Sequence, residues 1–193
     1  KAFAAALAEK GCQLSSANSI NIGRLVPQVV YYVYAYAKLL EAGEIEAGEQ
    51  INVTVPTGNF GNILAAYLAK EMGVPVKTLI CASNENKVLY DFFRTGTYDR
   101  NRDFILTTSP SKIFEDTGYL IDTHTGVAAS VYNHYKEETK DPAKTVIAST
   151  ASPYKFSGSV LEAIDGVRPE EDEFAIVDRL AELSGVVIPQ AVE

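Results

Sequence analysis

Residues 51–82 have the sequence INVTVPTGNFGNILAAYLAKEMGVPVKTLICA. The first five, 51–55, form a short run rich in β-branched residues that a proline ends, which predicts a strand. Residues 62–72 carry apolar side chains at helical spacing and are followed by a glycine, which predicts a helix. A second apolar run, at 76–82, predicts the next strand. The order strand, helix, strand is that of a parallel βαβ unit, so this stretch predicts an α/β fold.

The rest of the chain continues the same alternation. Apolar spacing predicts five further helices, at residues 25–40, 88–94, 122–135, 160–164 and 170–183. A short apolar run predicts one further strand, at 145–150. The polar residues 99–112 predict a long irregular connection, which in a compact domain is uncommon.

Composition restricts the class of partner. The chain has 193 residues, of which 47% are hydrophobic, and 17 Lys and Arg against 25 Asp and Glu give a net charge of -8. This charge argues against a nucleic-acid partner and against an anionic membrane surface. No apolar run reaches the ~20 residues that span a bilayer. Cys12 and Cys81 lack the paired spacing of a zinc site, so we expect no metal, two buried thiols and a cytoplasmic location.

The segment 55–62, VPTGNFGN, lies between a predicted strand and a predicted helix, where open α/β sheets bind their ligands. Gly58 and Gly61 allow a tight turn, and the helix start adds free N–H groups, so the segment can hold a phosphate without a basic side chain. It lacks the spacing of a nucleotide P-loop or a dinucleotide site, which favours a single phosphate. The alternative is that both glycines only shape a turn. Asn59 and Asn62 favour binding, because amides can both brace the loop and donate hydrogen bonds to an anion.

Residues 56–62 resemble the cofactor-phosphate loop of threonine synthases, which are pyridoxal-phosphate enzymes of the tryptophan-synthase-β fold type. Ordered motifs on both sides extend the resemblance over most of the chain: SANSINIGR at 16–24, LICASNEN at 79–86, DFFRTG at 91–96, TTSPS at 107–111 and STASPYKF at 149–156. The resemblance implies a three-layer α/β fold of fold type II, with a largely parallel sheet and flanking helices. Residues 1–193 would then be a large part of the catalytic region of a two-domain enzyme.

The resemblance also implies a site for pyridoxal 5'-phosphate. Main-chain N–H groups would hold the cofactor phosphate, from Gly58, Asn59, Phe60, Gly61 and Asn62. Thr150 would face the pyridine nitrogen. A neutral hydroxyl at that position does not require the nitrogen to be protonated, in contrast to an aspartate partner.

Three further residues, Asn18, Ser19 and Arg24, would contact the phosphate of a substrate, O-phosphohomoserine. A planar guanidinium binds phosphate through two parallel hydrogen bonds, and an amide and a hydroxyl complete the contacts. From the residues alone, two plainer interpretations stay open. Asn18 and Ser19 are of the types that begin helices, and Arg24 can be a solvated surface charge.

Two features depart from the family pattern. The lysine that forms the Schiff base lies in a Ser-Phe-Lys-Asp stretch that has no match in this sequence, so no catalytic residue is assigned. The Phe-x-x-Thr-Gly-Tyr motif follows almost directly on Ser111, although a helical stretch precedes it in the family. We therefore expect a discontinuity at 111–112. His124 lies in a stretch similar to the family's Asp-Pro-His-Thr, where we expect local hydrogen bonds at a helix start.

The resemblance implies that O-phosphohomoserine loses phosphate and gains water to give threonine. Two alternatives stay open: another fold-type-II pyridoxal-phosphate lyase acting on serine, threonine or cysteine derivatives, and a catalytically silent homologue that binds a phosphate ligand. In each case we expect a small-molecule ligand, no nucleic-acid or membrane partner, and a monomer or homodimer.

Overall fold

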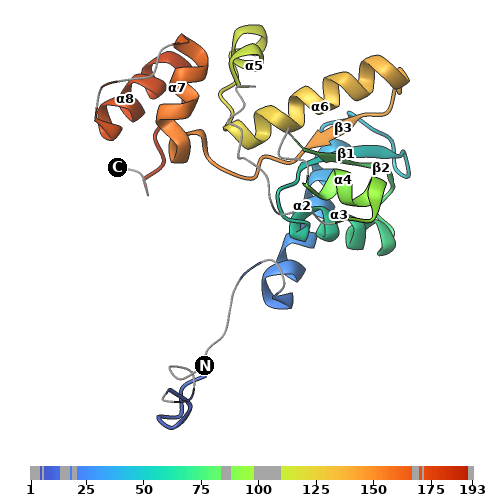
Figure 1. Ribbon diagram of the computed structural model, residues 1–193. Helices are drawn as coiled ribbons and strands as arrows, with labels where there is room; N and C mark the ends of the chain where they lie inside the picture. The colour runs from blue at the N-terminus through green and yellow to red at the C-terminus, as the bar shows by residue number, and fades with distance from the viewer. Residues whose placement is uncertain are drawn as a thin grey trace. The chain divides into compact units, whose positions relative to one another are not determined.

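The computed structural model describes residues 7–13, 21–83, 88–97, 110–166 and 172–190, together with residues 5, 18 and 170 (Figure 1). The chain forms two compact units. The first comprises residues 1–47 and 59–74, and the second comprises residues 48–58 and 75–193.

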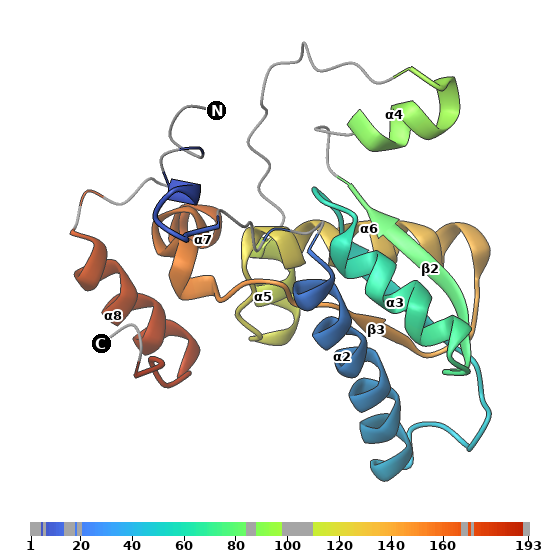
Figure 2. The same cartoon turned by 90° about the horizontal axis from the view of Figure 1, so that it is seen from below.

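The first unit contains two packed helices, α2 (Ile22–Glu41) and α3 (Gly61–Glu71), which lie side by side in Figure 2. The buried residues of α2 recur every three or four positions, as an inner face requires: Leu25, Val29 and Tyr32. Asn21 begins α2, because its side-chain oxygen accepts the N–H of Gly23 at 2.9 Å. Both helices were predicted from apolar spacing, and both are confirmed.

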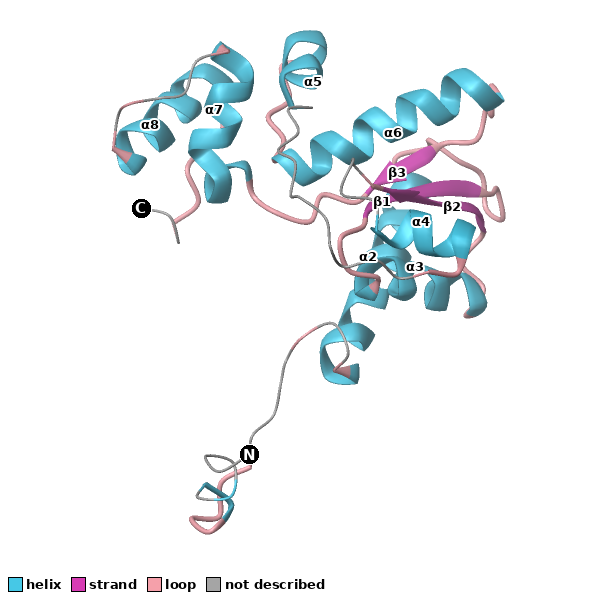
Figure 3. Ribbon diagram, viewed as in Figure 1, coloured by secondary structure: helices cyan, strands magenta, loops and turns pink. Residues whose placement is uncertain are grey.

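The second unit contains a parallel sheet in the order β2-β1-β3 (Figure 3). The strands are β1 (Ile51–Pro56), β2 (Val76–Ala82) and β3 (Thr145–Ile147). Helix α6 (Thr123–Thr139) contacts all three strands. The predicted parallel sheet is confirmed, although β3 ends three residues earlier than expected.

A second group of helices in this unit comprises α5 (Pro110–Thr117), which precedes α6 in the chain, and three elements after β3: the 3₁₀ turn η1 (Pro153–Phe156), α7 (Ser157–Asp165) and α8 (Glu173–Ser184). They share an apolar core formed by Leu120, Tyr154, Val160, Leu161, Ile176, Val177 and Leu180. Helix α8 begins later than predicted. Its N-cap is Asp172, whose Oδ1 accepts the N–H groups of the two residues after Glu173 at 3.0 and 3.2 Å.

Two expectations need correction or qualification. Cys12 and Cys81 are both exposed, so the expectation of buried thiols is wrong. Cys81 is exposed because side chains alternate along β2, where its neighbours Ile80 and Ala82 are buried. The connection expected at 99–112 is helical at its end, where α5 begins, and most of it lies outside the described residues. Helix α4 (Val88–Thr95) agrees with its prediction.

A buried carboxylate, Asp141, joins α6 to the amino ends of the strands. Its side chain is 6% exposed and accepts a hydrogen bond from Lys77 Nζ at 2.8 Å. The other donors are the N–H of Ala143 at 3.0 Å, Asn52 Nδ2 at 3.2 Å and the Tyr135 hydroxyl at 2.9 Å. The Lys77 ammonium, followed by these other donors, holds the pKa of Asp141 well below its ordinary value.

We expect Asp141→Asn to destabilise the protein at neutral pH and to change its response to acid. Because the native pKa is lowered, the charged carboxylate stabilises the fold above its unfolded-state pKa, near 3.8, and this stabilisation is lost as the pH falls further. Urea unfolding of both proteins at several pH values measures the effect. The difference between them should be constant above about pH 5 and shrink below about pH 4. A difference that persists unchanged at pH 2 would show that the charge of Asp141 contributes nothing.

Candidate functional site

The first turn of α3 presents main-chain N–H groups that the helix itself does not use. The first intrahelical hydrogen bond joins the N–H of Leu64 to the carbonyl of Phe60 at 2.9 Å. The N–H groups of Gly61, Asn62 and Ile63 come before that of Leu64 and therefore have no acceptor within the helix. No side chain in the described part of the chain caps this end at Phe60. An uncapped helix N-terminus, with the positive end of the helix dipole, suits a phosphate group.

The two glycines of the segment have a different role from the one expected. Gly61 is the first residue of α3, and neither Gly61 nor Gly58 is among the described glycines with positive φ. The turn therefore does not need glycine for its backbone angles. A Cβ atom at Gly58 would meet no other atom within 4 Å. What Gly58 contributes is an uncovered backbone, which a ligand can approach closely.

The side chain of Asn62 is directed toward α2 by two hydrogen bonds. Its Oδ1 accepts the hydroxyl of Tyr32, and its Nδ2 donates to Gln28 Oε1 at 2.9 Å. Burial raises the pKa of the Tyr32 hydroxyl, which stays protonated as a donor. The Asn62 amide therefore braces the segment, as expected, and its donation of a hydrogen bond to an anion stays a prediction. The amide holds the first turn of α3 against α2, and one of its two N–H groups is used for this contact.

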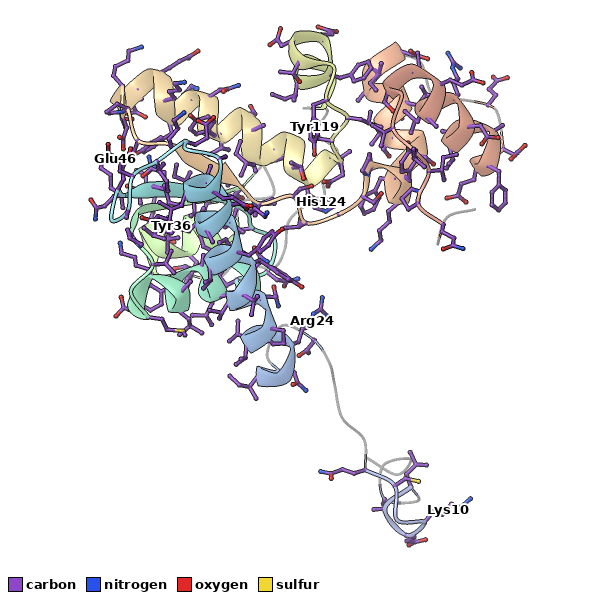
Figure 4. All side chains as sticks on the ribbon, turned by 180° about the vertical axis from the view of Figure 1, so that it is seen from behind. Lys10, Arg24, Tyr36, Glu46, Tyr119 and His124 are labelled. Atoms are coloured by element: carbon purple, nitrogen blue, oxygen red, sulfur yellow. The ribbon has the colours of Figure 1, made fainter. Side chains whose placement is uncertain are left out.

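The three residues predicted to bind a substrate phosphate lie at or before the start of α2. Arg24 is exposed in the first turn, and its carbonyl accepts Gln28 Nε2 at 2.7 Å (Figure 4). Gln28 thus links the turn that carries Arg24 to the first turn of α3 through Asn62. Asn18 is also exposed, whereas Ser19 lies outside the described residues. The described N-cap of α2 is Asn21, so the plainer interpretation of Asn18 as this cap is wrong.

In the second unit, the chain beyond β3 continues alongside β1 before it leaves the sheet. The N–H of Ala148 donates to the carbonyl of Thr54 at 2.9 Å, one residue after β3 ends. Ser149 and Thr150 follow at the carboxyl edge of the sheet, and both are exposed. Thr150 therefore lies outside the regular strand, at the edge where α/β sheets bind ligands.

The start of α6 lies beside this segment. Asp122 is fully buried and caps the helix, because its Oδ1 accepts the N–H groups of His124 at 2.8 Å and Thr125 at 3.3 Å. His124 Nδ1 lies 3.1 Å from the same oxygen, and its ring centroid lies 5.2 Å from that of Phe156. The local hydrogen bonds that were expected for His124 are therefore confirmed. Figure 4 labels this residue.

Sequence reasoning missed the side chains that organise both regions. They are Gln28 and Tyr32 in the first unit, and Asp122, Thr125 and Ser149 in the second. One signal was available for the first pair. Gln28 and Tyr32 are four residues apart, on the face of α2 that also carries the buried Leu25 and Val29. A polar residue within an apolar helix face has to find a partner across the interface.

Among the described helices, none is both long and apolar enough to cross a bilayer. The described residues also contain no group of three or more histidine, cysteine, aspartate or glutamate side chains that could hold a metal ion.

Comparison with known proteins identifies the family. Residues 125–187 match the family model described as "Threonine synthase, C-terminal". The human protein named threonine synthase-like 1 is 59% identical over a match that includes 81% of this chain and 30% of that protein. The threonine synthase of Corynebacterium glutamicum is 43% identical, with 88% of this chain and 49% of that protein covered. The chain thus spans half or less of the length of these two relatives.

Solved structures agree with the sequence matches. The PLP-bound threonine synthase from Brucella melitensis has a TM-score of 0.64 and 26% identity, and the match covers 89% of this chain and 48% of that one. The threonine synthase from Escherichia coli has a TM-score of 0.65 and 27% identity, with 84% and 45% covered. The α/β fold predicted from residues 51–82 is therefore that of the fold-type-II enzymes. Over the part of its relatives that it spans, the chain belongs to the threonine synthase family.

Proposed function

We propose that the whole protein is a pyridoxal-phosphate-dependent lyase that converts O-phosphohomoserine and water to threonine and phosphate. The observation that carries this proposal is the uncapped N-terminus of α3, directly after the glycine segment. It offers main-chain donors for a phosphate in a family that includes a PLP-bound member. The net charge of -8 is no obstacle, since main-chain N–H groups need no basic side chain to bind one phosphate.

The residues present fit the cofactor. We propose that its phosphate is bound by the N–H groups of Gly58, Asn59, Phe60, Gly61 and Asn62. Thr150, with an exposed hydroxyl at the end of its sheet, is proposed as the partner of the pyridine nitrogen. When bound, the cofactor supplies an electron-withdrawing ring. The chain's own contribution is orientation: Gln28 and Tyr32 hold Asn62, and with it the first turn of α3.

We propose that Asn18, Ser19 and Arg24 bind the phosphate group of the substrate. The support is that Arg24 is exposed and that Gln28 connects its turn, by two successive hydrogen bonds, to Asn62 in the first turn of α3. Within the first unit, this connection places the start of α2 and the start of α3 in one hydrogen-bonded group. Arginine is suited to the role because its guanidinium matches the geometry of a phosphate.

A second candidate function is supported by the sequence identities of this chain to its two relatives. The human relative at 59% identity carries the name threonine synthase-like 1, whereas the Corynebacterium glutamicum threonine synthase is 43% identical. The second candidate is therefore a fold-type-II lyase of the same cofactor that acts on a different amino-acid derivative. A catalytically silent homologue that binds a phosphate ligand is the remaining alternative.

We further propose that residues 1–193 belong to the catalytic region of a two-domain enzyme and that the family's sequence is interrupted at 111–112. The match to the human relative extends over 223 residues, although it includes only 81% of the 193 residues of this chain. The alignment is therefore longer than the part of this chain that it includes, which supports the presence in the relative of residues that this chain lacks. Helix α5 runs through positions 111–112, so the proposed junction lies inside a helix. A cytoplasmic location stays a prediction.

Phosphate release tests the proposed reaction. The whole protein, supplied with pyridoxal phosphate and O-phosphohomoserine, is expected to release inorganic phosphate and form threonine in equal amounts. Phosphate is measured colorimetrically and threonine chromatographically. The absence of both products would contradict the proposed reaction. Turnover of a serine, threonine or cysteine derivative would then favour the second candidate, and no turnover of either kind, with cofactor still bound, would favour the silent homologue.

A further inference from the structure

Three polar side chains at the start of α6 and the end of β3 form a continuous hydrogen-bonded chain. Asp122 is fully buried, and the hydroxyl of Thr125 donates to its Oδ2. Thr125 is 5% exposed, and its Oγ1 lies 3.2 Å from Ser149 Oγ. The residues at the two ends of this chain, Asp122 and Ser149, come from segments that are separated by the whole of α6.

The buried carboxylate determines the direction of this chain. A hydroxyl has a single proton, and that of Thr125 is directed to Asp122 Oδ2. Thr125 can therefore only accept a hydrogen bond at its contact with Ser149, and the Ser149 hydroxyl is the donor. This contact directs the proton of the exposed Ser149 hydroxyl toward α6.

This arrangement exceeds what a helix cap requires. The capping bonds of Asp122 are those to the N–H groups of His124 and Thr125, and both involve Oδ1. The second oxygen, Oδ2, is occupied by the hydroxyl of Thr125, whose contact to Ser149 adds nothing to the cap. The contact instead links the rigid start of a helix to a segment that has left the regular strand.

We propose that Asp122 and Thr125 are positioning residues, which hold Ser149 and thereby restrict the orientation of the neighbouring Thr150. Because Ser149 and Thr150 are consecutive in the chain, a hydrogen bond that holds the first reduces the conformational freedom of the second. The inference rests on the proposed function in one respect, namely that Thr150 is the partner of the cofactor's pyridine nitrogen.

A pair of variants of Thr125 tests the inference. Thr125→Val removes the hydroxyl with little change of shape, and Thr125→Ser keeps the hydroxyl. The matched control is Thr123→Val, which makes the same change at the first residue of α6. Two quantities are measured for each protein: hydrogen–deuterium exchange of the segment 148–151 without cofactor, and the dissociation constant of pyridoxal phosphate from a fluorescence titration.

We expect Thr125→Val to accelerate exchange at 148–151 by about five- to tenfold, as the loss of one hydrogen bond predicts, while exchange in the middle of β1 is unchanged. The dissociation constant of pyridoxal phosphate should rise by a similar factor. Thr125→Ser should restore both values, and Thr123→Val should change neither. Unchanged exchange at 148–151, or an equal acceleration along the whole chain, would overturn the inference.

The measurements separate a failure of the inference from a failure of the proposed function. If Thr150→Val weakens cofactor binding but Thr125→Val does not, the positioning role is refuted and the cofactor site stands. If the unmodified protein binds no pyridoxal phosphate, while Thr125→Val still accelerates exchange at 148–151, the proposed function fails and the positioning of the segment is upheld.

Discussion

Replacing Arg24 with alanine is expected to lower kcat/KM for O-phosphohomoserine more than any other single substitution in the first unit. Removing one partner of a hydrogen-bonded charge pair costs about 2–5 kcal/mol, which corresponds to about 30- to 4,000-fold. The loss should fall mainly on KM if Arg24 contacts the phosphate equally before and during the reaction. Initial rates of phosphate release by the whole protein measure both constants.

The controls for Arg24 follow from its position on α2. Lys38 is an exposed cation in the last turn of the same helix, paired with Glu41, so Lys38→Ala should leave kcat/KM nearly unchanged. Arg24→Lys should recover only part of the loss, because an ammonium cannot make two parallel hydrogen bonds. Equal activity of Arg24→Ala and the unmodified protein would refute this residue's role. It would favour a lyase whose substrate carries no phosphate.

The largest effect on stability is expected for Leu180→Ala in α8. Leu180 is fully buried in the apolar core that α7 and α8 share. Truncating a buried leucine removes its transfer free energy and leaves a cavity, which together cost about 2–5 kcal/mol. Urea unfolding followed by circular dichroism measures the free energy. Helical signal should be lost at a clearly lower urea concentration than in the unmodified protein.

Leu183 provides the matched control, since it lies three residues later on the same helix and is 46% exposed. Leu183→Ala makes the same chemical change without a buried cavity, and we expect an effect within about 0.5 kcal/mol. Equal effects of the two substitutions would mean that the buried cluster does not determine the stability of this region.

The elements of the fold were predictable because the signals for them are local. The limits of α2 and α3 follow from apolar spacing and from residues at their ends, and β2 has the bounds that its apolar run indicated. The prediction was less accurate where a neighbour decides the outcome. Strand β3 is three residues long because only Asn52, Val53 and Thr54 of β1 pair with it, and α8 begins where Asp172 caps it.

The candidate site was predictable as a set of positions but not as a set of contacts. The order of glycine segment and helix start predicts a phosphate site at residues 58–62, and the first turn of α3 there has main-chain donors that the helix itself does not use. The direction of the Asn62 side chain was not predictable. Its partner Tyr32 is 30 residues away, and Tyr31 and Tyr34, close by on the same helix, are exposed.

The amino-acid sequence by itself determined the α/β class, the family resemblance and the location of the segment proposed to bind phosphate, because periodicity, capping residues and motif order act over a few neighbouring residues. Only the tertiary structure decided which polar side chains form hydrogen bonds with one another. Asn62 is held by Gln28 and Tyr32, and Ser149 is held by Thr125, which lies 24 residues earlier. Such pairs form because a buried polar group must find a partner, and folding determines which one comes within reach.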